Sequence, residues 1–285
     1  MYSNIHMHTH YCDGGEEPLK YVKEAIAKGL KSIGFSAHAP APFECNWAVP
    51  QNKLGKYIEE IKNLKNEYKT HLQIYLGLEV DYFPDIVPYT LNLLKSEPFD
   101  YFIGSVHFID FYLDGKRWTI DGPNEEFRKG FNDIFNNDAI EVTRKFFEYN
   151  RKMIMDLKPP VIGHIDKLKM QYRPDCFISE DHPVFKEELL KTLEIAQKAG
   201  SIVEINTRGF YKKRDNGFYP GEAVFKDMHD MGVKVMVNSD AHLPHEITSG
   251  FDIAFQALRK AGYKEHYILF NNKYEPISIQ CCLNT

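Results

Sequence analysis

The chain has 285 residues, of which 43% are hydrophobic and 26% are charged, and its formal net charge is −5. These values are typical of a globular protein with a full core, and barrels of this length commonly form one domain. We therefore expect residues 1–285 to form a single domain. The acidic balance argues against a nucleic-acid-binding surface, which needs a basic stripe to neutralise phosphates.

No apolar stretch approaches the roughly 20 residues that span a bilayer, and the first residues are polar and histidine-rich, unlike a signal peptide. The five cysteines are odd in number and contain no Cys-x-x-Cys pair. This pattern favours reduced thiols over a disulfide framework. We expect a cytoplasmic protein that binds neither membrane nor nucleic acid, and the sequence does not indicate an oligomeric state.

Seven short apolar runs alternate with amphipathic segments along the chain. The expected strands are Ser3–Ile5, Ser32–Phe35, Gln73–Leu78, Tyr101–Val106, Pro160–Ile162, Ile202–Ile205 and Lys234–Val237. The expected helices are Pro18–Lys28, Leu54–Tyr68, Asn124–Asp156, Asp181–Ala199, Gly221–Met231 and Thr248–Ala261. Such alternation implies right-handed crossovers and a parallel sheet, open or closed. An eighth run, Tyr267–Phe270, would either finish the sheet or cover it.

Two long insertions follow expected strands. The first runs from His38 to Pro50, and the second runs from His107 to about Phe127. Both leave strand ends on the same face of the sheet. Long loops in that position commonly form the walls or lids of a substrate pocket.

Histidines and carboxylates follow the strand ends in a regular order. His6 and His8 follow the first strand, and Asp240 and His242 repeat the same spacing after the last one. Residues two apart in a strand share a face, so each pair points the same way. Between these pairs, a single residue follows each of four strands: His38, Glu79, His107 and His164. Parallel strands would bring all these side chains to one mouth of a barrel.

These residue types indicate a multinuclear metal site. Imidazole nitrogen and carboxylate oxygen suit zinc, manganese or iron, and the absence of thiolate ligands argues against a structural zinc finger. Glu79 follows an apolar strand, where an unpaired buried carboxylate would be costly. Bridging two cations would remove that cost.

Five segments resemble motifs of the PHP (polymerase and histidinol phosphatase) superfamily, and of its histidinol-phosphatase branch in particular. The matching segments are residues 6–14, 104–108, 163–166, 204–207 and 238–242. The resemblance covers nearly the whole chain in order. It implies an α/β fold, a distorted (βα)7 TIM-like barrel with its metal site at the C-terminal mouth of the strands.

The resemblance also implies two or three divalent ions and their ligands. The first ion would be held by His6, His8, Glu79 and Asp240, the second by Glu79, His107 and His164, and the third by Asp13, His38 and His242. Many family members carry histidine one residue after Asp13, where this chain has Gly14.

The implied activity is hydrolysis of L-histidinol phosphate to L-histidinol and phosphate, a step of histidine biosynthesis. The positive charge of the ions suits a phosphate monoester, and a hydroxide that bridges two ions would be the nucleophile. Asp240, His242 or a metal-bound water could protonate the leaving alkoxide. Arg208, Lys169 and Lys212 are candidates for binding the phosphate. A carboxylate or an aromatic wall would suit the substrate amine, and the aromatic candidates are Phe43, Trp47, Trp118 and Tyr219.

Other readings stay open. The enzyme could act on another small phosphate ester, such as a nucleotide or sugar phosphate, whereas a nuclease is disfavoured by the acidic balance. An amidohydrolase barrel would carry a metal-bridging lysine after its fourth strand, where this chain has His107. A non-catalytic metal-binding module would need no open coordination position.

Overall fold

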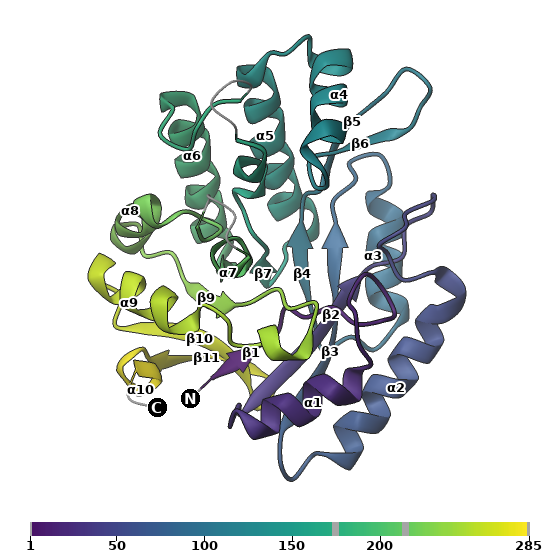
Figure 1. The fold of residues 1–285 in the computed structure, drawn as a ribbon, viewed down its shortest axis with the longest axis vertical. Coiled ribbons are helices and arrows are strands. Elements are labelled where there is room, and N and C mark those ends of the chain that lie inside the picture. The colour runs from purple at the N-terminus through teal and green to yellow at the C-terminus, as the bar shows by residue number, and fades with distance from the viewer. Residues whose placement is uncertain (1, 173–176, 213–216, 284–285) are drawn as a thin grey trace.

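The computed structural model describes residues 2–172, 177–212 and 217–283 (Figure 1). Its centre is a seven-stranded parallel sheet in the order β1-β2-β3-β4-β7-β8-β9. The strands are β1 (Ser3–Asn4), β2 (Ser32–His38), β3 (Gln73–Asp81), β4 (Tyr101–Ser105), β7 (Val161–Ile162), β8 (Ile202–Asn206) and β9 (Val235–Asn238). All seven expected strands are therefore confirmed, with ends that differ by up to three residues.

The sheet curls until its edge strands β1 and β9 meet. Just beyond the two strands, the amide of His8 donates to the carbonyl of Ala241 at 2.8 Å, and the amide of Ala241 donates to the carbonyl of His6 at 3.1 Å. Further back, the amide of Ile5 donates instead to the side-chain oxygen of Asn238 at 2.9 Å. A side chain thus replaces a backbone acceptor in the hydrogen bonding between β1 and β9. The result is a nearly closed, distorted barrel, as the sequence predicts.

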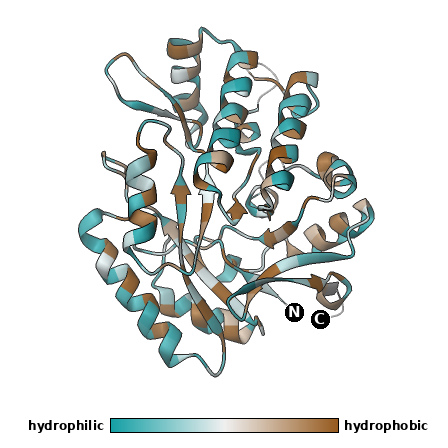
Figure 2. Cartoon of the chain, turned by 180° about the vertical axis from the view of Figure 1, so that it is seen from behind, coloured by the Kyte–Doolittle hydropathy of each residue, from teal (hydrophilic) through white to brown (hydrophobic). Residues whose placement is uncertain are grey.

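Helices surround the barrel (Figure 1). They are α1 (Pro18–Ala27), α2 (Leu54–Glu67), α3 (Val87–Ser96), α4 (Asn124–Phe135), α5 (Ala139–Leu157), α6 (Pro183–Ala199), α7 (Arg208–Tyr211), α8 (Phe225–Asp230), α9 (Phe251–Ala261) and α10 (Gln280–Leu283). Figure 2 shows hydrophobic central strands and largely hydrophilic outward helix faces, the pattern of amphipathic helices on a buried sheet. Among the described residues, no helix combines the length and apolar character that crossing a bilayer requires.

The prediction of one long helix over residues 124–156 is wrong, because two helices, α4 and α5, occupy this stretch. Asn136 and Asn137 adopt left-handed backbone conformations, with φ of 49° and 63°, and end α4. Asp138 then caps α5 by accepting from the amides of Ile140 and Glu141, each at 2.9 Å. Asparagine tolerates the left-handed region and aspartate is a preferred N-cap, so the Asn-Asn-Asp run was the missed signal.

Two hairpins complete the fold. The second insertion contains β5 (Phe108–Phe111) and β6 (Arg117–Thr119), which the sequence analysis did not predict. The eighth apolar run belongs to β10 (Glu265–Phe270), which pairs only with β11 (Lys273–Ser278) and does not join the barrel sheet. Leu269 of β10 packs with Ile5 and Tyr101 near the strand starts. This hairpin therefore covers the end of the barrel opposite the candidate ligands.

Tyr101 fills the barrel interior above that hairpin. Its hydroxyl donates to the carbonyl of Ile5 at 2.6 Å. Two glycines make room for the ring, since a Cβ on Gly34 would lie 2.4 Å from the Tyr101 hydroxyl oxygen and one on Gly77 would lie 2.4 Å from Cζ. The absence of both side chains lets one tyrosine span the barrel and bond the opposite strand.

This packing predicts that Gly77→Ala lowers the free energy of unfolding by about 1–3 kcal/mol, because the added methyl group overpacks the core. Gly55→Ala in α2 is the matched control. Nothing lies within 4 Å of the Cβ that it would add, so the free energy should stay unchanged or rise by up to about 1 kcal/mol. Urea denaturation followed by circular dichroism measures both, and equal effects of the two changes would contradict this packing.

Candidate metal centre

The C-terminal strand ends surround a cavity of about 220 Å³. Its lining residues are Asp13, His38, Trp47, Glu79, His107, Asp121, Gly122, His164, Lys167, Arg208, Asp240 and His242. Seven of the nine expected metal ligands are among them. The other two, His6 and His8, do not line the cavity. They are fully buried, and each contacts Glu79.

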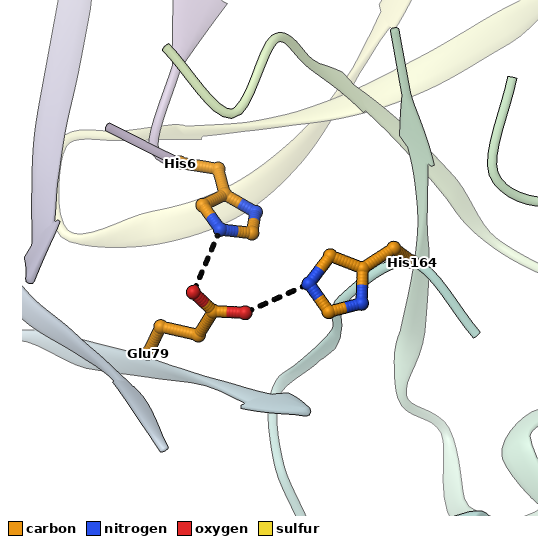
Figure 3. Close-up of side chains that lie close together, drawn as sticks. All are labelled: His6, Glu79 and His164. Atoms are coloured by element: carbon orange, nitrogen blue, oxygen red, sulfur yellow. Dashed lines mark hydrogen bonds and ion pairs between the residues drawn. The ribbon is translucent and has the colours of Figure 1, made fainter. Parts of the chain in front are cut away.

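Glu79 lies at the centre of the cluster and is 1% exposed. Its Oε2 lies 3.2 Å from Nε2 of His6 and 3.3 Å from Nε2 of His8. Its Oε1 lies 2.8 Å from Nε2 of His164. Figure 3 shows the carboxylate between the His6 and His164 rings, so its two oxygens face two different groups of histidines. A carboxylate that bridges two ions needs this arrangement.

The remaining expected ligands complete both groups. Asp240 places Oδ1 3.4 Å from Nε2 of His8 and 3.8 Å from Nε2 of His6. On the other side, Nε2 of His107 lies 3.3 Å from Nε2 of His164. Both sets therefore converge on Glu79.

A third set gathers around Asp13. Its Oδ1 lies 3.4 Å from Nδ1 of His8 and 3.8 Å from Nε2 of His38, and its Oδ2 lies 3.0 Å from Nε2 of His242. The next residue packs on the backbone, since a Cβ on Gly14 would lie 2.3 Å from the carbonyl oxygen of His8. A larger residue at that position would displace this segment.

The donor set fits divalent cations. Four buried atoms that face the cluster lack a hydrogen-bond partner within the described parts of the chain: His6 Nε2, His8 Nε2, His38 Nδ1 and Asp240 Oδ1. Buried polar atoms in proteins are nearly always paired. Ring nitrogens and carboxylate oxygens are ligands of zinc, manganese and iron, so a cation would satisfy these atoms. Among the residues that the structure describes, five overlapping triplets, one of which includes Asp81, have ligand atoms within 4.8 Å of one another.

Glu204 on β8 is not one of the expected metal ligands, but it binds one of them, His6. The sequence analysis assigned it no role. Its Oε1 lies 2.6 Å from Nδ1 of His6, and its Oε2 accepts from the amide of His164 and the side-chain amide of Asn206, each at 3.0 Å. The carboxylate holds a proton on Nδ1 of His6 and leaves Nε2 as the nitrogen that faces Glu79, where a cation would bind. Carboxylate–histidine pairs of this kind orient metal ligands.

Asp81 has the same relation to His107. Its Oδ1 lies 2.7 Å from Nδ1 of the ring and accepts from the His107 amide at 3.2 Å. Asp81 and Glu79 both lie on β3, two residues apart, and therefore share a face of the strand. That spacing is the signal that could have identified Asp81 from the sequence.

The carboxylates control the charge of the cluster. Burial acts to lower the pKa of His107, but the negative charges of Asp81, Glu79 and Asp121 outweigh it and raise the pKa to about 9. Burial also opposes the charged form of His6, yet Glu204, Asp240 and Glu79 hold its pKa well above the usual value. These two histidines therefore carry protons near neutral pH unless a cation replaces them.

Of the three basic residues expected to bind phosphate, only Arg208 lines the cavity. Arg208 lines the cavity and donates from Nη1 to the carbonyl of Asp240 at 2.8 Å. Lys169 does not line it, because its buried Nζ binds Glu180 at 2.8 Å and Asp166 at 3.1 Å. Lys212 is also absent from the lining and pairs with Glu246.

Lys167 takes the place that the sequence analysis gave to Lys169. It lines the cavity, and its Nζ lies 3.1 Å from Oδ2 of Asp121. Both lysines lie in the short 3₁₀ segment Lys167–Gln171, where a difference of two residues changes the direction of the side chain.

The fold and this cluster define a class of protein, a TIM-like barrel with a candidate multinuclear metal centre at its C-terminal mouth. The model of the PHP domain family matches residues 4–208. The chain belongs to the PHP domain family.

Several relatives match most of the chain. A probable histidinol-phosphatase of Schizosaccharomyces pombe is 29% identical over 283 residues, which cover 90% of this chain and 87% of the relative. The histidinol-phosphatase of Bacillus subtilis is 27% identical and covers 87% of this chain and 96% of its own. The Lactococcus lactis histidinol phosphate phosphatase, in a crystal structure with zinc, L-histidinol and phosphate, shares the fold with a TM-score of 0.74 and 24% identity. That match covers 96% of this chain and 98% of the other.

The Glu204–His6 pair predicts that Glu204→Gln weakens metal binding by about 10- to 100-fold, because the amide no longer orients the ring as a carboxylate does. Competition with a chromophoric chelator measures the affinity. Glu222→Gln, an exposed change on the segment Glu222–Val224, is the control and should leave affinity unchanged. Equal affinities of the wild type and Glu204→Gln would contradict the positioning role.

Metal binding should also depend on pH. Because the pKa of His107 is raised to about 9, the metal-free ring is protonated at pH 7 and a cation must displace that proton. The apparent affinity should therefore fall as the pH decreases from 9, by about tenfold per pH unit for one displaced proton. Titration calorimetry in buffers of different ionisation enthalpy measures the released protons. An affinity that does not change between pH 7 and pH 9 would contradict this assignment.

Proposed function

We propose that this protein is a histidinol-phosphatase, a metal-dependent phosphomonoesterase that hydrolyses L-histidinol phosphate to L-histidinol and phosphate. The observation that carries the proposal is the central carboxylate of Glu79 between two groups of histidines, with Lys167 and Arg208 on the wall of the same cavity. Relatives with this name align over most of the chain. Histidine biosynthesis follows from that activity.

The residues that would hold the ions are the nine that the sequence indicates: His6, His8, Asp13, His38, Glu79, His107, His164, Asp240 and His242. Two ions would share Glu79, and a third would lie at Asp13. Zinc, manganese and iron all accept these donors. When bound, such ions neutralise charge on phosphate oxygens and acidify water.

Lys167 and Arg208 would bind the phosphate. Both follow neighbouring strands, β7 and β8, and therefore approach the cavity from the same side. The guanidinium of Arg208 uses one nitrogen for the carbonyl of Asp240, and its fork geometry suits the oxygens of a phosphate. The ammonium of Lys167 forms an ion pair with the carboxylate of Asp121.

Asp240 and His242 are the two side chains considered for protonating the leaving alkoxide. Burial opposes the charge of Asp240, but His6, Arg208 and His242 hold its pKa well below the usual range, so the carboxylate stays ionised and is a poor proton donor. His242 is 17% exposed, and its Nε2 lies 3.0 Å from Oδ2 of Asp13. The same nitrogen cannot hold both a cation and a proton, so His242 would supply the proton to the leaving alkoxide only while the third ion is absent.

Phosphate release from L-histidinol phosphate by metal-analysed protein tests the function, beside a panel of nucleotide and sugar phosphates. We expect a strong preference for L-histidinol phosphate and a loss of about 100-fold or more in kcat for His107→Ala. Activity spread evenly over the panel would overturn the assignment of the substrate. No release from any ester by the metal-loaded protein would overturn the phosphatase itself.

Two variants test the phosphate contacts in the same assay. Arg208→Met should raise KM by about 10- to 100-fold, because a charge-assisted hydrogen bond is lost. Lys212→Met is the matched control, since Lys212 lies in the same loop but outside the cavity lining. Its KM should stay within about twofold of the wild type. Equal effects would contradict the separation of these two residues.

A further inference from the structure

One aromatic side chain lines the cavity and packs against further aromatic rings. Trp47, in the first insertion, lines the cavity and is half-buried. Its ring stacks on Phe108 at a centroid distance of 5.2 Å and an interplanar angle of 17°. Phe108 in turn contacts Phe43 at 5.9 Å and Phe83 at 5.4 Å. The indole therefore has support behind it.

Arg117 holds together the aromatic rings that support Trp47. Its guanidinium lies 4.7 Å from the ring centres of Phe43 and Phe83 and 4.5 Å from that of Phe111, and it binds the carboxylate of Asp85 at 2.6 Å. Three separate segments are joined in this way: the first insertion, the connection after β3, and the β5–β6 hairpin. A wall held by such contacts is ordered before a ligand arrives, which reduces the entropy lost on binding.

The cavity is therefore polar at one side and aromatic at another. Lys167 and Arg208 follow β7 and β8, whereas Trp47 follows β2, and three steps of the sheet order separate β2 from β7. The histidines and carboxylates of the candidate metal centre line the same cavity. A phosphate ester bound with its phosphate near the cations has its organic part free to extend towards Trp47.

We propose that Trp47 is the specificity-determining residue of this pocket and that the ring of the substrate's leaving group stacks on its indole face. This inference rests on the proposed function and extends it to the recognition of a planar, cationic ring. The electron-rich face of tryptophan attracts cations and stacks on flat rings.

The other aromatic candidates from the sequence do not occupy this position. Trp118 is 1% exposed and packs between Phe127 and Phe135. Tyr219 is also 1% exposed. Phe43 faces Arg117 and is not part of the cavity lining.

Steady-state kinetics of Trp47→Leu and Trp47→Phe test the proposal with L-histidinol phosphate and with glycerol 3-phosphate, which has no ring. We expect Trp47→Leu to lower kcat/KM for L-histidinol phosphate by about 10- to 100-fold, mainly through KM. The value for glycerol 3-phosphate should change less than about threefold, and Trp47→Phe should restore part of the loss. Leu113→Ala, at the fully exposed hairpin turn, is the control and should match the wild type. Equal losses on both esters, or no loss on either, would overturn the proposal.

Intrinsic fluorescence gives a second readout, because the chain has only two tryptophans. Addition of L-histidinol and phosphate to the metal-loaded wild type should change the emission, and the change should vanish in Trp47→Leu, where only the buried Trp118 remains. A change that persists in Trp47→Leu, or no change in the wild type, would overturn stacking on Trp47.

The two proposals fail in different ways. If the wild type prefers another ester, the assignment of the substrate is wrong, and phenyl phosphate compared with glycerol 3-phosphate still tests Trp47. Trp47→Leu should then lose about tenfold on phenyl phosphate alone. If L-histidinol phosphate is preferred equally by the wild type and Trp47→Leu, the proposed function stands and the role of Trp47 is wrong.

Discussion

The buried carboxylate of Glu79 is the constraint on which the rest of the structure depends. It is 1% exposed and faces ring nitrogens of His6, His8 and His164 within 3.3 Å. A charge in such a place is costly unless cations or donors compensate it. In the metal-free protein His6 and His107, whose pKa values are raised, compensate in part by holding protons, and divalent ions would do so more fully. The barrel, its closure and the outer carboxylates all bring ligands to this one group.

The arrangement requires backbone geometry that ordinary strands do not supply. Asp240 has a φ of 51°, in the left-handed region where non-glycine residues are uncommon. Its carbonyl accepts from Arg208, and its carboxylate accepts from Asn206 at 3.1 Å. Glu204 binds Asn206 as well as His6. Strained conformations persist where the surroundings over-determine them, and they gather at functional sites. One hydrogen-bonded network thus orients the ring of His6 and holds Asp240, a candidate ligand, in a strained conformation.

Much of the fold was predictable because it depends on local patterns. Apolar runs placed the seven strands, and their alternation with helices implied parallel order. The misses have local causes too. The end of α4 depended on Asn136 and Asn137, whose left-handed conformations an amphipathic pattern does not reveal. The β5–β6 hairpin was missed because its strands have only four and three residues, and α3, a helix of ten residues, was missed as well. The eighth run, around Leu269, covers the barrel because its partner strand β11 lies next in the chain.

The sequence by itself determined which ligand types follow which strands, since side-chain period and strand order are local properties, and the motif resemblance grouped them around Glu79. Only the tertiary structure decided which basic and aromatic side chains reach the cavity. Lys167 lines it and Lys169 does not, although both follow the same strand. Trp47 lines it and Trp118 is buried elsewhere. Direction within a short loop depends on contacts with distant segments, such as Glu180 and Phe108, and those contacts exist only after the chain has folded.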